Sequence, residues 1–182
     1  MSAKRQKTYD NTADGCKQCA KLATGSAPIL WQNKHFAVMH KGAPCGVVGH
    51  LLLLSKRHFQ GPSSMTDEEA SAVGLALKQC EAALEHVTGC DRVYTAALGS
   101  ATSGSHFHAH MMPLYVGDDM KPKTVTGTPF DIFLQEKLAA DKVDGAAADA
   151  GKCAEIGDAF KRYMADKDAA RREAVDEEAE DR

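Results

Sequence analysis

The sequence lacks any strong excess of positive charge. Its 22 Lys and Arg residues are outnumbered by 25 Asp and Glu residues, which gives a formal net charge of −3. Binding to a nucleic-acid polymer through its phosphates requires a broad basic surface. We therefore expect no polymeric nucleic acid among the partners of this chain.

The sequence also lacks long apolar runs, and residues 51–54 form a run as long as any other. A helix that spans a bilayer needs about 20 mostly apolar residues, so we expect no membrane partner. No apolar segment follows the basic residues 4–7, as it would in a secretory signal. These absences predict a cytoplasmic protein with reduced cysteines, and the short basic stretch leaves a nuclear location open.

A chain of 182 residues with 43% hydrophobic side chains is large enough for one globular core that needs no disulfide. Composition divides the chain into three parts. Residues 1–13 are expected to be a disordered N-terminal tail, residues 14–115 a globular domain, and residues 116–182 a C-terminal helical extension with a charged tail. No internal repeat is present.

Hydrophobic periodicity predicts five strands and one long helix in the central part. The expected strands cover residues 29–31, 35–39, 47–54, 92–98 and 107–115. The helix starts after Thr66, an N-cap with Glu69 three residues later as in a capping box, and ends at Gly89. In the extension we expect a short helix at 129–140, a flexible join at 144–148 and a helix at 152–180. A helix packed on one face of an antiparallel sheet is an α+β fold.

Three histidines, His106, His108 and His110, alternate with other residues in the last predicted strand. Alternate residues of a strand share one face, so this triad places three imidazoles together while Phe107 and its alternating neighbours face the core. Imidazoles near neutral pH bind metals, transfer protons or attack electrophiles. The alternation therefore predicts a chemical site on one face of the sheet.

The triad, followed by two apolar residues and Pro113, resembles the signature of the histidine triad (HIT) family of nucleotide hydrolases and transferases. Residues 49–58 are similar to the family's Gly-His strand, which ends in Lys-x-His. The resemblance covers roughly residues 14 to 115. It implies a HIT-like antiparallel sheet with a helix on one face, a nucleotide substrate and a homodimer.

The resemblance also implies roles for individual residues. His108, the middle histidine, would attack the α-phosphorus of a nucleotide and form a covalent nucleotidyl-histidine. His110 would bind phosphate oxygens, and His50 would lie beside the site. Ser103, three residues before the triad, matches a serine that assists the leaving group, and Thr102 belongs to the same hydroxyl-rich loop. These residues imply hydrolysis or nucleotidyl transfer on a nucleoside phosphoramidate or a dinucleoside polyphosphate.

Two positions depart from the family pattern. An Asp that binds the ribose is replaced by Gly42, and an Asn eight residues before the serine is replaced by Thr95. Both changes affect ribose recognition more than phosphate chemistry. They leave open a nucleotide-binding adaptor with little activity, and a phosphorylase in which phosphate replaces water also stays open.

Cys16 and Cys19 form a Cys-x-x-Cys pair, which can supply two of the four ligands of a tetrahedral zinc. In several HIT proteins such a pair binds zinc together with the histidine that closes the Gly-His strand and the first triad histidine. By resemblance these are His58 and His106. The resemblance thus implies a structural zinc and no organic cofactor. A pair of free thiols is the alternative for the cysteines. A hydrolytic zinc held by all three triad histidines is a separate reading of the triad, although no Asp or Glu near the triad could serve as its base.

Overall fold

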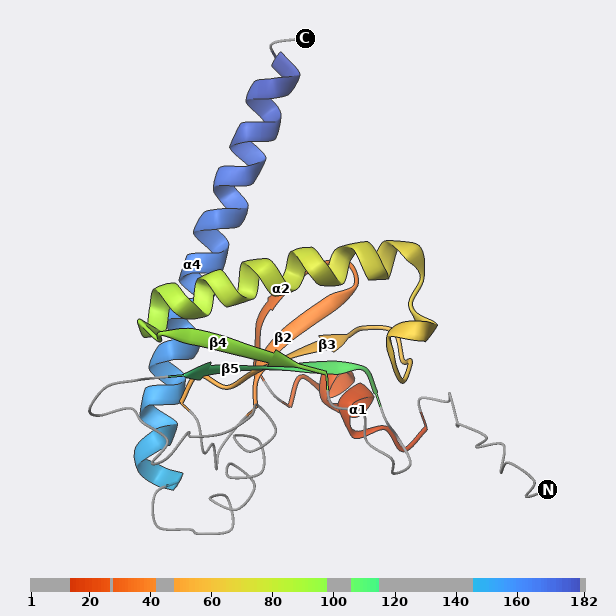
Figure 1. Cartoon of the computed structure of the whole chain (residues 1–182), viewed down its shortest axis with the longest axis vertical. Helices are drawn as coiled ribbons and strands as arrows, with labels where there is room; N and C mark the ends of the chain where they lie inside the picture. Colours follow the sequence, from red (N-terminus) through yellow and green to blue (C-terminus); the bar gives the residue numbers. More distant parts are fainter. Residues whose placement is uncertain (1–13, 27, 42–47, 98–105, 115–145, 181–182) are drawn as a thin grey trace, which may run out of the picture.

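The computed structural model describes residues 14–26, 28–41, 48–97, 106–114 and 146–180 (Figure 1). The elements follow one another as α1 (Lys17–Thr24), β1 (Ile29–Gln32), β2 (Phe36–His40), β3 (Leu51–Ser55), a 3-10 turn η1 (Pro62–Ser64), α2 (Asp67–Thr88), β4 (Arg92–Ala96), β5 (His108–Leu114) and α4 (Ala146–Glu180). Among these residues no helix combines the length and apolar character that a bilayer span requires.

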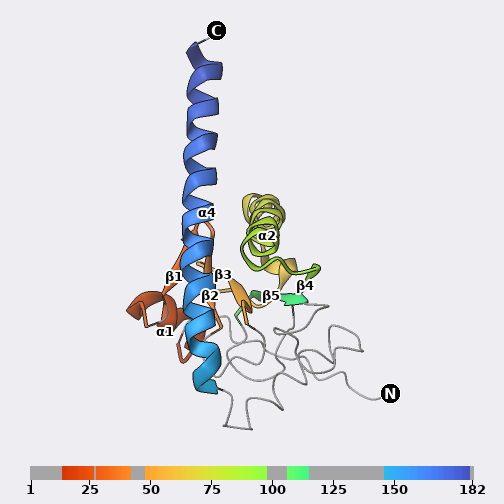
Figure 2. The ribbon, with the colours of Figure 1, turned by 90° about the vertical axis from the view of Figure 1, so that its left-hand side faces the viewer.

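The five strands form one antiparallel sheet in the order β1-β2-β3-β5-β4. Helices α2 and α4 cover one face of this sheet, which we name the core face (Figures 1 and 2). The opposite face carries His108 and His110 and is named the triad face. The predicted α+β fold with a helix on one face of an antiparallel sheet is confirmed.

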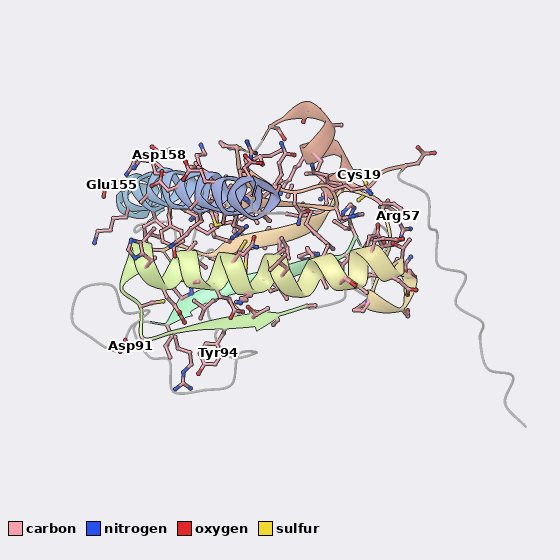
Figure 3. All side chains as sticks on the ribbon, turned by 90° about the horizontal axis from the view of Figure 1, so that it is seen from above. Cys19, Arg57, Asp91, Tyr94, Glu155 and Asp158 are labelled. Carbon is pink, nitrogen blue, oxygen red and sulfur yellow. The ribbon has the colours of Figure 1, made fainter. Side chains whose placement is uncertain are left out.

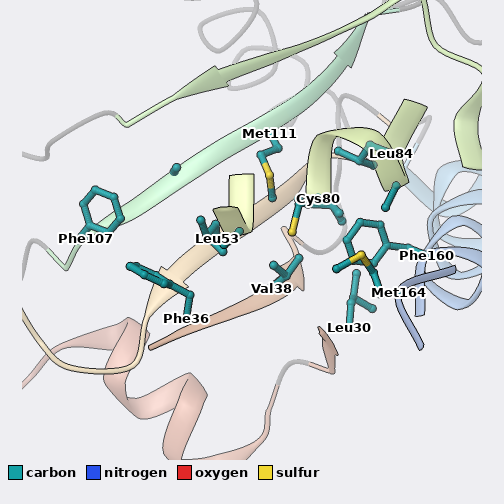
Figure 4. Packing of buried hydrophobic residues seen from close by; sticks show 14 of the residues in the cluster. Leu30, Phe36, Val38, Leu53, Cys80, Leu84, Phe107, Met111, Phe160 and Met164 are labelled. Carbon is teal, nitrogen blue, oxygen red and sulfur yellow. The ribbon is translucent and has the colours of Figure 1, made fainter. Parts of the chain in front are cut away.

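The main core lies between the sheet and the two helices (Figure 4). Phe107, Ala109 and Met111 are buried in it, as the alternation of the triad strand predicts. Phe36 and Phe107 meet edge to face, with ring centroids 6.3 Å apart. Burial of this strand's alternate residues fixes its register, because a shift by one residue would turn the histidines into the core.

Helix α2 has the caps that the sequence predicts. The Thr66 hydroxyl accepts from the Glu69 backbone nitrogen, and the Glu69 carboxylate accepts from the Thr66 backbone nitrogen. The helix ends at Gly89, whose φ of 62° is left-handed and favours glycine.

Helix α4 packs on the same core through Phe160 and Met164, which are almost completely buried. The Trp31 indole donates to Asp168 at 2.9 Å and ties β1 to this helix. The C-terminal end of the helix rises away from the sheet (Figures 1 and 2). Residues 146–148, predicted as part of a flexible join, are helical, because their three alanines are the strongest helix formers.

One helix was not predicted from the sequence, and the start of one strand was misplaced. Helix α1 was not predicted; Cys16 caps it by accepting from the Cys19 backbone nitrogen, an unusual N-cap that propensity does not reveal. Strand β3 begins at Leu51 rather than at residue 47, because Val48 and Gly49 form a turn in which Gly49 has a φ of 82°.

Some predictions fall outside the described residues. They concern the tail at 1–13, the short helix at 129–140 and the join at 144–145. The division of the chain at residue 115 stays a prediction.

Candidate functional site

The two strands that carry the site lie next to each other in the sheet. In their pairing, Leu52 faces His110 and Leu54 faces His108. These side chains share the triad face with Met39, and Leu22 of α1 packs on this apolar patch. The histidines therefore sit beside a buried apolar surface, where polar interactions are stronger than in water.

His108 is half-buried, and its ring is held by the backbone of its own strand. Its Nδ1 lies 2.8 Å from the His106 carbonyl oxygen. Because a carbonyl only accepts, Nδ1 carries the hydrogen and donates it. In the neutral ring the lone pair is then on Nε2. This is the tautomer that a nucleophilic or basic imidazole needs.

His110 and His50 are buried and in direct contact. His50 Nε2 lies 2.9 Å from His110 Nδ1, so one of these nitrogens donates and the other accepts. The ring centroids of His108 and His110 are 5.0 Å apart. When His50 donates, the neutral His110 ring carries its hydrogen on Nε2, where it can serve as a donor.

His106 is turned toward a different set of partners. Its Nε2 donates to the Ser55 carbonyl oxygen at 2.6 Å, which leaves the lone pair on Nδ1. Burial lowers the pKa of His106, although the Ser55 carbonyl acts in the opposite direction. The neutral ring is a metal ligand rather than a charged group.

Four potential metal ligands meet at this end of the triad strand: Cys16, Cys19, His58 and His106. We name them the metal cluster. Their ligand atoms all lie within 4.8 Å of one another. In the described part of the chain this is the one group of three or more side chains that could hold a metal ion. His108 and His110 are not part of it, so a zinc held by all three triad histidines does not fit.

The distances inside the metal cluster fit a tetrahedral zinc. The two Nδ1 atoms of His58 and His106 are 3.3 Å apart. Cys19 Sγ lies 3.3 Å from each of these nitrogens, and Cys16 Sγ lies 3.6 Å from the His106 nitrogen. In a tetrahedral site with zinc bonds of about 2.0 Å to nitrogen and 2.3 Å to sulfur, two nitrogens lie about 3.3 Å apart. A nitrogen and a sulfur lie about 3.5 Å apart.

Burial and the neighbouring Cys16 raise the pKa of the Cys19 thiol to about 11. This thiol therefore stays protonated near neutral pH unless a cation is present. A bound metal ion removes that penalty and releases the proton.

An ion pair fixes the segment next to the metal cluster. The Arg57 guanidinium donates to both oxygens of Glu69, at 2.9 and 2.7 Å, and also to the Ser64 carbonyl. Arg57 and the Thr66 backbone nitrogen lower the pKa of Glu69 to about 2. This pair connects the residue before His58 to the start of α2. Figure 3 shows Cys19 and Arg57 at the same end of the molecule.

The structure answers some of the remaining site predictions. Ser103, Thr102 and Gly42 lie outside the described residues. Thr95 is described, and its hydroxyl donates to Glu81 of α2, so it faces the core side rather than the triad face. Sequence reasoning missed Ser55 and Arg57 as supporting residues, because no motif marks contacts that arise only when the strands pair.

Comparisons with known proteins identify structures with a similar fold. No protein-family profile matches the sequence, and no curated protein matches it either. A zinc-bound histidine triad family protein from Mycobacterium smegmatis has a TM-score of 0.58 at 18% identity, over 87% of this chain and 99% of that one. A hypothetical histidine triad nucleotide-binding protein from Sulfolobus tokodaii has a TM-score of 0.54 at 16% identity, over 81% and 93%.

A uridylyltransferase is similar over 81% of this chain and 45% of its own, with a TM-score of 0.52 and 20% identity. At such identities the likeness concerns the fold, and it agrees with the fold that the triad and Gly-His motifs predict. The chain therefore has the fold of the histidine triad proteins.

Proposed function

We propose that this protein is a nucleotide hydrolase or nucleotidyl transferase that acts through His108. The substrate is a nucleoside phosphoramidate or a dinucleoside polyphosphate, and the reaction takes place at its α-phosphate. One observation carries the proposal. The His108 ring donates from Nδ1 to the His106 carbonyl, which leaves the Nε2 lone pair for attack on the triad face.

In the first step His108 Nε2 attacks the α-phosphorus. A phosphorus–nitrogen bond forms, and the bond between phosphorus and the leaving group breaks. The leaving group departs with the electron pair of that bond and takes a proton. By resemblance Ser103 supplies or holds this proton, and Thr102 contacts the phosphate.

His110 stabilises the charge that develops on the phosphoryl oxygens. With His50 donating to His110 Nδ1 across 2.9 Å, the His110 hydrogen is on Nε2, the nitrogen that would donate to a phosphate oxygen. Such an oriented donor is most effective in a buried site. His50 thus acts by holding the tautomer of His110.

In the second step a water molecule attacks the same phosphorus and the phosphorus–nitrogen bond breaks. Hydrolysis releases a nucleoside monophosphate and frees His108. A transferase passes the nucleotidyl group to another acceptor in the same way.

We also propose that Cys16, Cys19, His58 and His106 hold a structural zinc ion. The distances between the sulfur and nitrogen atoms of the metal cluster support zinc. With four protein ligands the ion has no open position for substrate. It would attach α1 to the start of the triad strand and leave His108 and His110 for chemistry. A homodimer and a cytoplasmic location remain predictions from the sequence.

A screen of adenosine and guanosine phosphoramidates and dinucleoside polyphosphates tests the reaction. We expect wild-type turnover of at least one of them and a loss of at least about 10³-fold in His108→Ala. His35→Ala removes a half-buried histidine outside the site and serves as the control. Full activity of His108→Ala with the intact fold would refute the proposal.

A nucleotide-binding adaptor is the second candidate. It is favoured by Thr95, whose hydroxyl bonds to Glu81 rather than facing the triad. An adaptor binds nucleotides with no turnover by wild type or by His108→Ala. A phosphorylase is separated by its products, because inorganic phosphate would then yield a nucleoside diphosphate from an adenylyl donor.

A further inference from the structure

Ser55, the last residue of β3, contacts His106 and Phe107, the two residues that precede β5. It has no exposed surface. Its backbone nitrogen and its hydroxyl both donate to the Phe107 carbonyl, at 3.2 and 3.3 Å. Its carbonyl oxygen and hydroxyl oxygen lie 2.6 and 3.0 Å from His106 Nε2. One buried residue therefore holds both the His106 ring and the backbone that follows it.

The contacts of Ser55 determine which nitrogen of His106 faces the metal cluster. Since the Ser55 carbonyl only accepts, His106 Nε2 carries the hydrogen. The hydroxyl donates its own hydrogen to the Phe107 carbonyl, so its oxygen is a second acceptor for the His106 Nε2–H. His106 Nδ1 then directs its lone pair at Cys16, Cys19 and His58.

The same segment orients the proposed nucleophile. The His106 carbonyl accepts from His108 Nδ1. The Phe107 nitrogen of that peptide unit donates to Phe59 at 2.7 Å, which holds the unit from its other side. Any movement of this peptide would therefore shift the acceptor on which the His108 tautomer depends.

We propose that Ser55 is a positioning residue whose hydroxyl orients the metal-binding ring of His106 and, through the His106–Phe107 backbone, the ring of His108. The second half of this proposal rests on the proposed function, and the first half does not. His58 offers a contrast, because its buried Nε2 has no hydrogen-bond partner within the described residues. Ser55 thus supports the His106 ligand from outside the cluster, and such groups typically change metal affinity by about 10- to 100-fold.

The test compares Ser55→Ala with Ser55→Thr, which keeps the hydroxyl, in the full-length zinc-loaded protein. Cys80→Ala is the matched control, since it removes one heavy atom from a buried side chain on the core face. Zinc affinity is measured by competition with a chromophoric chelator. The hydrogen bonds of the His106 Nε2–H and the His108 Nδ1–H are followed by NMR through the solvent exchange of these imidazole protons. Steady-state kinetics at saturating zinc follow for any phosphoramidate that wild type hydrolyses.

In Ser55→Ala we expect zinc binding about 10-fold weaker, faster solvent exchange of both imidazole protons, and a kcat that falls more than KM changes. Ser55→Thr should recover the wild-type zinc affinity and exchange rates, and Cys80→Ala should keep both. Unchanged zinc affinity and exchange rates in Ser55→Ala would overturn the positioning role. An equal loss in Cys80→Ala would overturn it as well.

Failure of the proposed function gives a different result. Wild type would then turn over none of the substrates, while Ser55→Ala would still weaken zinc binding and speed the exchange of the His106 Nε2–H. That outcome supports the positioning of the metal ligand and counts only against the chemistry at His108.

Discussion

The two faces of the sheet are built on different principles. On the core face, residues of β2, β3 and β5 pack against α2 and α4 through apolar side chains that need only the right size and spacing. On the triad face the histidines depend on individual hydrogen bonds, such as those between His108 and His106 and between His110 and His50. The comparison teaches that the apolar core and the proposed chemistry lie on opposite sides of a single layer of backbone. Substitutions on one face should change mainly one of the two properties.

The largest loss of stability is expected for Phe160→Ala on the core face. Phe160 has no exposed surface and belongs to the main core. Truncation of a buried Phe costs about 3–5 kcal/mol through lost transfer free energy and the cavity left behind. Urea unfolding measures the change. The activity of the fraction that stays folded should equal that of wild type, and a large fall in this activity would show that the faces are not independent.

Removal of zinc from the metal cluster should give the next largest effect. With free zinc at a few hundred times its dissociation constant, binding contributes about 3 kcal/mol to the free energy of unfolding. A chelator should therefore lower the melting temperature of wild type. The variant Cys16→Ser, Cys19→Ser, which lacks both thiolates, should show no further fall on chelation. Equal melting temperatures of wild type with and without chelator would argue against a bound metal.

The ion pair between Arg57 and Glu69 should contribute about 1–2 kcal/mol, after allowance for the half-exposed arginine. Because the pKa of Glu69 is lowered to about 2 in the folded protein from an ordinary value of 4.5, this stability is present above about pH 4.5. It is lost as the pH falls toward 2. Glu69→Gln should destabilise the protein at pH 7 and should weaken the pH dependence of unfolding between these values. An identical pH dependence in wild type and variant would contradict the assignment.

The smallest effect is expected for the contact between β1 and α4. Trp31→Phe removes the indole donor to Asp168 and should cost about 1 kcal/mol, as for one hydrogen bond to a charged group that is partly solvated. Asp168→Asn keeps an acceptor oxygen and should cost less. Chemical denaturation of both variants measures the difference. A larger loss in Asp168→Asn would mean that another contact of Asp168, such as its ion pair with Arg171, matters more.

The sequence predicts the core face better than the triad face. Alternation and helical periodicity depend on neighbours in the chain, so β5 and the capping box of α2 could be read directly. The motifs also predicted that Cys16 and Cys19 meet His58 and His106, which are up to 90 residues away along the chain. That prediction came from the family resemblance, because local spacing carries no information about such distances.

The supporting contacts could not be predicted. Ser55 acts through its position at the end of β3, next to the entry of the triad strand. Thr95 replaces a family Asn, and the register of β4 turns its hydroxyl toward α2. Both depend on strand pairing rather than on residue type. The start of β3 was also misplaced, because the left-handed Gly49 breaks the apolar pattern only once its backbone is known.

The central claim is that His108 forms a covalent bond to the nucleotidyl phosphorus. Wild-type protein is mixed with a reactive adenosine phosphoramidate, quenched within one turnover and digested for mass spectrometry under conditions that preserve phosphoramidates. We predict an adenylyl group on His108, absent from His108→Ala and lost with time as product appears. Turnover with no adduct at His108, or an adduct on another residue that forms at the catalytic rate, would contradict the account.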